Sequence, residues 1–151
     1  MVIMKLKNNY GFSTVWMLVV IFILTFVIGS WANNYINILR FNKEKELIRI
    51  GLDYKKAIRS YYNNSPGGSM SYPHSLTDLT RDLRYNDKTI RYLRKVEIDP
   101  ISGKKFRLVL NKDNQIIGVY SESKQRPLKQ DNFPRELYNL FHKNSYDEWI
   151  F

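Results

Sequence analysis

The sequence predicts an α+β protein, in which one long N-terminal helix is packed by a small head with short helices and an antiparallel β-hairpin. Three observations lead to this prediction. Residues 12–32 form an uncharged apolar run, a helical repeat of apolar residues continues to residue 62, and two β-rich segments are joined by a polar turn. The 151 residues leave room for one domain and one additional element.

The apolar run of residues 12–32 reads FSTVWMLVVIFILTFVIGSWA and contains no charged residue and no proline. As a helix, it is long enough to cross about 30 Å of hydrocarbon. It shows no polar face, which a helix in a soluble domain would usually have. We therefore expect residues 12–32 to be the transmembrane half of the helix.

Residues 33–62 are predicted to continue this helix as an amphipathic half, since no proline interrupts them. Apolar residues recur there at steps of three and four, which places them on one helical face. This face consists of Leu47, Ile50, Tyr54, Ala57 or Ile58, and Tyr61. Glu44 is expected to point outward, and Gly51 weakens a helix interior by about 1 kcal/mol. The alternative is a loop near Asn33 and Asn34 that separates two helices.

The predicted head, residues 63–133, begins with a loop rich in asparagine, proline and glycine. Residues 75–79 then form a capping box that leads into a short helix, with Leu76, Leu79 and Leu83 on one face. Residues 99–104 are expected to form a turn because they combine proline and glycine.

Two β-rich segments, residues 106–110 and 116–121, are separated by a four-residue polar turn, which predicts a hairpin. Residues 134–151 form a C-terminal tail with a possible short helix that opens at Pro134. The aromatic residues of this tail, Tyr146, Trp149 and Phe151, either pack on the head or contact a neighbouring subunit.

Composition and motifs limit the kinds of chemical site and partner that we expect. The absence of cysteine excludes disulfides and thiolate metal sites. The net charge of +10 is spread along the chain, so we expect a solvated basic surface and do not expect nucleic acid as a partner. His74 and His142 have no nearby histidine or cysteine, and no nucleotide-binding or nucleophile motif is present. An enzyme, a metal site and a cofactor are not expected; calcium on the widely spaced Asp113, Glu122 and Asp131 is possible but unsupported.

The segment KNNYG that ends at Gly11, followed by FSTVWMLVV from Phe12, resembles the type III signal of type IV pilins and type II secretion pseudopilins. The head resembles that of the pseudopilins in an ordered series of segments: YYNNSPGG (61–68), YPHSLTDL (72–79), DPISGK (99–104), GVYSESK (118–124) and RPLK (126–129). The resemblance covers about residues 7–133.

This resemblance implies that residues 1–11 are a leader, cut off between Gly11 and Phe12 by a prepilin peptidase, and that Phe12 is then N-methylated. It also implies a bacterial inner-membrane protein that crosses the membrane once, with its head in the periplasm. The implied partners are the prepilin peptidase, membrane lipid, an inner-membrane assembly platform and other pseudopilins, with which the subunit forms a periplasmic filament that drives protein export.

Four positions of the helix, Trp16, Leu18, Val19 and Val20, correspond to the assembly region of such subunits. The family usually has glutamate at the fifth position after the cut, whereas this chain has Trp16, which suggests a minor subunit. Charge alone would not place the head outside, because Lys5 and Lys7 on one flank are outnumbered by a larger group on the other. That group contains Arg40, Lys43, Lys45 and Arg49.

Two further functions remain open from the sequence. One is a minor pilin of a type IV pilus or DNA-uptake system. The other is an uncut single-pass membrane protein that acts as a binding module or scaffold through its basic head.

Overall fold

The computed structural model describes residues 10–85 and 88–151, apart from the side chains of residues 10–12, 30 and 32–34. It is an α+β structure with the element order α1 (Tyr10–Asn63), η1 (Pro66–Gly68), β1 (Arg107–Leu110), β2 (Ile116–Tyr120), η2 (Arg135–Leu140) and η3 (Tyr146–Glu148). The chain divides into two compact units, one that ends at Leu39 and one that spans Arg40–Phe151. The second is called the head unit below.

Helix α1 is 54 residues long and continues without a break past Asn33 and Asn34. The alternative of two helices joined by a loop is therefore wrong. The predicted inward face is confirmed, since its members are buried in the head unit: Leu47, Ile50, Tyr54, Ala57, Ile58 and Tyr61. The helix ends where Pro66 fixes the backbone and Gly67 and Gly68 adopt positive φ angles.

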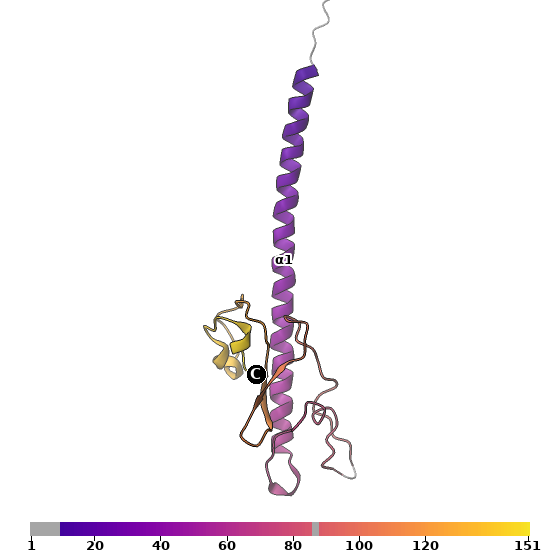
Figure 1. Ribbon diagram of the computed structural model, residues 1–151, viewed down its shortest axis with the longest axis vertical. Coiled ribbons are helices and arrows are strands. Elements are labelled where there is room, and N and C mark those ends of the chain that lie inside the picture. The colour runs from indigo at the N-terminus through magenta and orange to yellow at the C-terminus, as the bar shows by residue number, and fades with distance from the viewer. Residues whose placement is uncertain (1–9, 86–87) are drawn as a thin grey trace, which may run out of the picture. The chain divides into compact units, whose positions relative to one another are not determined.

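The predicted hairpin is also confirmed (Figure 1). Strands β1 and β2 pair in antiparallel register, Arg107 opposite Tyr120 and Leu110 opposite Ile116, with one irregularity after Val109. The turn between them is closed by the Asn111 side chain, which accepts hydrogen bonds from two backbone N–H groups. Ile116 and Val119 on β2 are buried in the core that the hairpin shares with α1.

The tail packs on the head unit instead of presenting its largest aromatic residues to solvent. Tyr146, Trp149 and Phe151 are buried, and the ring of Trp149 makes edge-to-face contacts with those of Phe133 and Tyr146. The backbone of Phe151 exchanges two hydrogen bonds with Val119 of β2, of 3.0 and 3.2 Å. The tail therefore completes the core beside the hairpin. The short helix predicted after Pro134 is present as the 3₁₀ helix η2.

The short helix predicted after residue 75 is absent: residues 76–80 form a turn. The carboxylate of Asp78 caps that turn by accepting hydrogen bonds from the backbone N–H groups of His74 and Ser75. The chain then leaves the turn, because the backbone of Asp82 pairs with Ile90. Leu79 is buried as predicted, but Leu83 is 72% exposed, so the predicted apolar face ends with the turn.

Candidate functional site

The first unit contains a helical surface that is apolar on every side. Ten consecutive side chains, from Val15 to Leu24, are large, apolar and exposed. Since successive residues of an α-helix differ by about 100° in direction, ten of them cover the whole circumference. Similar side chains follow at Val27, Ile28 and Trp31, and the exposed fractions from Val15 to Trp31 run from 38% to 77%. This surface is the candidate functional site.

The residues predicted for processing and assembly all lie on α1. Gly11 and Phe12 are in its first turn, and their side chains lie outside the described residues. The four assembly positions are exposed: Trp16, Leu18, Val19 and Val20. They point in different directions around the helix, so the structure brings them together as an apolar surface and not as a pocket.

Within the part of the chain that the structure describes, no helix is long and apolar enough to cross a membrane. The predicted span of residues 12–32 includes positions 12, 30 and 32, whose side chains lie outside that part. The span therefore stays a prediction.

Glu44 was expected to point outward, and this is wrong: the side chain lies in the head unit and the residue is 2% exposed. Its carboxylate accepts hydrogen bonds from the backbone N–H groups of Leu128 and Lys129, at 2.7 and 2.8 Å, and from the Tyr146 hydroxyl, at 2.6 Å. Burial and the bond to Glu44 raise the pKa of Tyr146. A charge at this depth is tolerable because three donors surround it.

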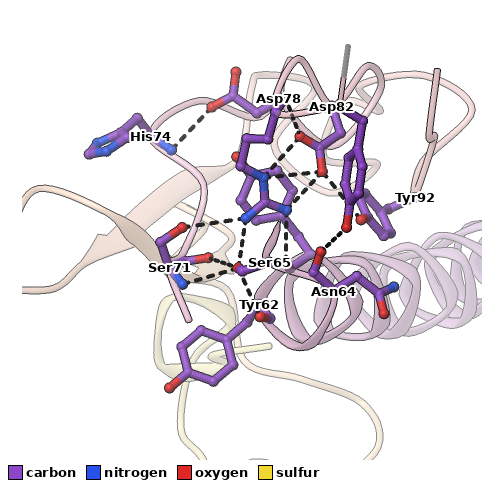
Figure 2. A network of polar contacts seen from close by, with 11 residues as sticks. Tyr62, Asn64, Ser65, Ser71, His74, Asp78, Asp82 and Tyr92 are labelled. Carbon is purple, nitrogen blue, oxygen red and sulfur yellow. Dashed lines mark hydrogen bonds and ion pairs between the residues drawn. The ribbon is translucent and has the colours of Figure 1, made fainter. Parts of the chain in front are cut away.

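A second buried carboxylate, Asp82, organises a polar network at the end of α1 (Figure 2). Arg84 forms an ion pair with Asp82 at 2.7 Å and also donates hydrogen bonds to the Tyr61 carbonyl and the Ser65 hydroxyl. Burial raises the pKa of Asp82, but hydrogen bonds and charge from Arg84 outweigh this effect, and the pKa is lowered overall. The network links the loop after α1 to the end of the helix. The Asp82 carboxylate and the Arg84 guanidinium already pair with each other.

The two histidines and Glu122 lie in other parts of the head unit. His74 lies in a bend, and the exposed His142 is 3.7 Å from the exposed carboxylate of Asp131. Glu122 pairs with Lys104 and Arg107. Among the described residues, no group of three histidine, aspartate or glutamate side chains could hold a metal ion, and calcium stays unsupported.

Sequence reasoning missed the contact between Gly51 and Phe151. Gly51 lies on the buried face of α1, and a Cβ atom built there would overlap the ring of Phe151. The sequence held a signal, because a glycine on the inward face of a helix leaves room for a close approach of another group. The partner could not be identified, since it lies one hundred positions further along the chain.

No protein family, curated protein or solved structure matches this chain.

Proposed function

We propose that the chain is a pilin-like subunit of the type II secretion pseudopilin kind. In this proposal the helix of residues 12–32 holds the subunit in the bacterial inner membrane, and prepilin peptidase cuts between Gly11 and Phe12. The mature subunit then enters a periplasmic filament whose growth drives protein export. Trp16 in place of glutamate makes it a minor subunit, which assembles with other pseudopilins.

One observation supports this proposal most strongly: a single helix has an apolar circumference over its first part and carries the head unit on its second part. An apolar surface of this kind is stable only when lipid or other apolar surfaces cover it, since exposed apolar area costs about 25 cal/mol per Å². A membrane covers it before assembly, and the helices of neighbouring subunits cover it in a filament. The head unit has its own core and remains folded in both states.

The experiment is the intact mass of the mature protein from its native membrane, with sequencing of the N-terminal peptide. The proposal expects a chain that starts at N-methylated Phe12. A start at Met1 would overturn it.

Replacing Gly11 tests the same step. We expect Gly11→Lys to abolish cleavage while the precursor accumulates in membranes, because a long charged side chain blocks entry of the backbone into the peptidase. Asn9→Lys is the matched control: it adds the same charge two residues earlier and should be processed normally. Equal processing of both variants would contradict the proposed cleavage site.

The second candidate is an uncut single-pass protein that binds a partner through its basic head. It is favoured by the positive charge after the apolar run, where Arg40, Lys43 and Lys45 outnumber Lys5 and Lys7 before it. The mass measurement separates the two, because this candidate keeps its first eleven residues. A minor pilin of a pilus or DNA-uptake system shares the processing step and would differ in the filament with which it co-purifies.

A further inference from the structure

We propose that the head unit binds anionic phospholipid headgroups at the end where α1 enters it. The binding surface is a basic collar, defined as Arg40, Lys43, Lys124, Arg126 and Lys129. The inference rests on the membrane anchor of the proposed function and adds a lipid-binding site within the head unit.

Two segments that are distant in sequence meet in the basic collar. Arg40 and Lys43 are three residues apart on α1, so they share a helix face, and that face continues to the buried Leu47. The guanidinium of Arg40 donates a hydrogen bond to the backbone carbonyl of Arg126, which places the loop of residues 124–129 against this face.

Glu44 fixes the loop in this position. Its buried carboxylate accepts the backbone N–H groups of Leu128 and Lys129, so the cationic loop is held at the helix by two hydrogen bonds to one side chain. Because the same carboxylate is covered and also accepts the Tyr146 hydroxyl, it offers no exposed negative charge that would compete with a phosphate.

Three cations of the collar are available to a ligand. Lys43, Lys124 and Arg126 are exposed, and within the described residues their side chains form no ion pair. The Lys129 ammonium lies 5.0 Å from the centre of the Phe133 ring. Asp147 lies beside the residue that precedes Lys124: its backbone N–H donates to the carbonyl of Ser123, and its carboxylate accepts the Ser145 hydroxyl.

The position of the collar in the chain favours a lipid as the occupant. Arg40 is the first charged residue after the apolar run, eight positions past Ala32, and the exposed Phe41 and Leu128 are neighbours of the cations in sequence. Cations next to apolar side chains suit the boundary between headgroups and acyl chains. In an anionic membrane, each lysine or arginine near the surface adds to the attraction, which falls off within about 10 Å at 0.1 M salt.

The test uses the full chain reconstituted in vesicles. The sequence has no cysteine, so Gln125→Cys provides a unique position for a fluorophore in the collar, at an exposed residue. We measure quenching of this fluorophore by headgroup-spin-labelled lipid in phosphatidylcholine vesicles with and without phosphatidylglycerol. Quenching is expected to be at least about two-fold stronger with phosphatidylglycerol, and the increase should disappear at high salt.

Two charge variants show whether the collar is responsible. Lys43→Gln/Arg126→Gln should remove the increase, whereas Lys105→Gln/Lys112→Gln should retain it. Lys105 and Lys112 are exposed on the hairpin side, and this pair changes the net charge by the same amount. Equal effects of both pairs would show that the net charge of the chain, and not the collar, causes the increase, and would overturn the proposal. Equal quenching in both vesicle types would overturn lipid binding altogether.

Flotation with neutral vesicles keeps the two proposals apart. A chain that floats with phosphatidylcholine but shows no extra quenching has its anchor and lacks the lipid site, which overturns only the collar. A chain that does not float with neutral vesicles lacks the anchor, which overturns the proposed function on which the collar rests.

Discussion

At the scale of single residues, Glu44 joins α1 to two segments that lie 84 to 102 positions further along the chain. Its three hydrogen bonds come from two backbone N–H groups and one hydroxyl, so the site requires an acceptor with two oxygen atoms. The amide of glutamine has only one oxygen, and its NH₂ group would face a donor. The residue is therefore a structural link despite its charge.

We expect Glu44→Gln to lower the free energy of unfolding of the head unit by about 2 kcal/mol, because a buried N–H group loses its acceptor. Chemical denaturation of the full chain in detergent, followed by near-ultraviolet circular dichroism of the head unit, measures the change. Glu46→Gln is the matched control. Glu46 is exposed and pairs with Arg49 at the surface, so its loss should cost less than about 1 kcal/mol. Equal losses would contradict the role of Glu44.

Tyr146 gives the head unit a dependence on alkaline pH. Its pKa in the folded state is raised by burial and by Glu44, so the unfolded chain ionises first, near pH 10. Stability from the protonated hydroxyl is therefore present below about pH 10 and is lost as the pH rises further. The pKa values of Tyr54, Tyr61 and Tyr92 are raised too, chiefly by burial.

Comparison with Tyr146→Phe isolates this residue, because the other tyrosines contribute equally to both proteins. Below about pH 9 the variant should be less stable by about 1 kcal/mol, since it lacks the hydrogen bond to Glu44. The difference should shrink as the pH rises above about 10, because only the wild type then loses free energy of unfolding by holding the Tyr146 proton in the folded state. A difference that stays constant between pH 8 and pH 11 would contradict the assignment. Denaturation curves over this pH range provide the measurement.

At the scale of elements, the tail is fastened to α1 and β2 by close approaches at two glycines. The ring of Phe151 occupies the space beside Gly51, and its carbonyl oxygen lies 2.6 Å from the position that a Cβ atom on Gly118 would take. Both contacts need the absence of a side chain. The tail is therefore part of the folded core and not an appendage.

We expect Gly51→Ala to lower the free energy of unfolding by about 1–3 kcal/mol, because the added methyl group overlaps the Phe151 ring. Helix propensity alone would give the opposite sign, a gain of about 1 kcal/mol. Gly29→Ala is the control, since a Cβ atom there meets nothing within 4 Å. In a Phe151→Leu background the cost of Gly51→Ala should fall, as thermal unfolding of the four proteins can show. Stabilisation by Gly51→Ala alone would contradict the contact.

The sequence was informative where a local pattern determines an element. The apolar repeat from Leu47 to Tyr61 predicted the buried face of α1, and the polar turn at residues 111–114 predicted the hairpin. Glu44 could not be assigned in this way, because its donors come from the far end of the chain. The short helix predicted after residue 75 is absent for a related reason: Asp82 pairs with Ile90, eight positions further along, and this contact outweighs the local capping pattern.

At the scale of the whole molecule, the two units differ in how their apolar side chains are covered. The head unit has a buried apolar core, whereas the first unit exposes its large apolar side chains over Val15–Trp31. The cations that follow the apolar run oppose a periplasmic head if only the charge rule for topology is considered. Lipid binding by the basic collar would give the same cations a role on either side of the membrane, because headgroups face both compartments.

In the proposed filament, Trp16 would limit the partners that the subunit accepts. In a filament core, the ammonium of Phe12 needs a negative partner, since an unpaired charge in apolar surroundings is costly. Trp16 offers none, so we expect the wild-type chain to form no homopolymer and Trp16→Glu to increase cross-linked homo-oligomers several-fold in cells that make prepilin peptidase. Phe22→Glu places the same charge about 9 Å further along the helix and should only impair membrane retention. Equal oligomer formation by Trp16→Glu and the wild type would show that the ammonium is satisfied in another way.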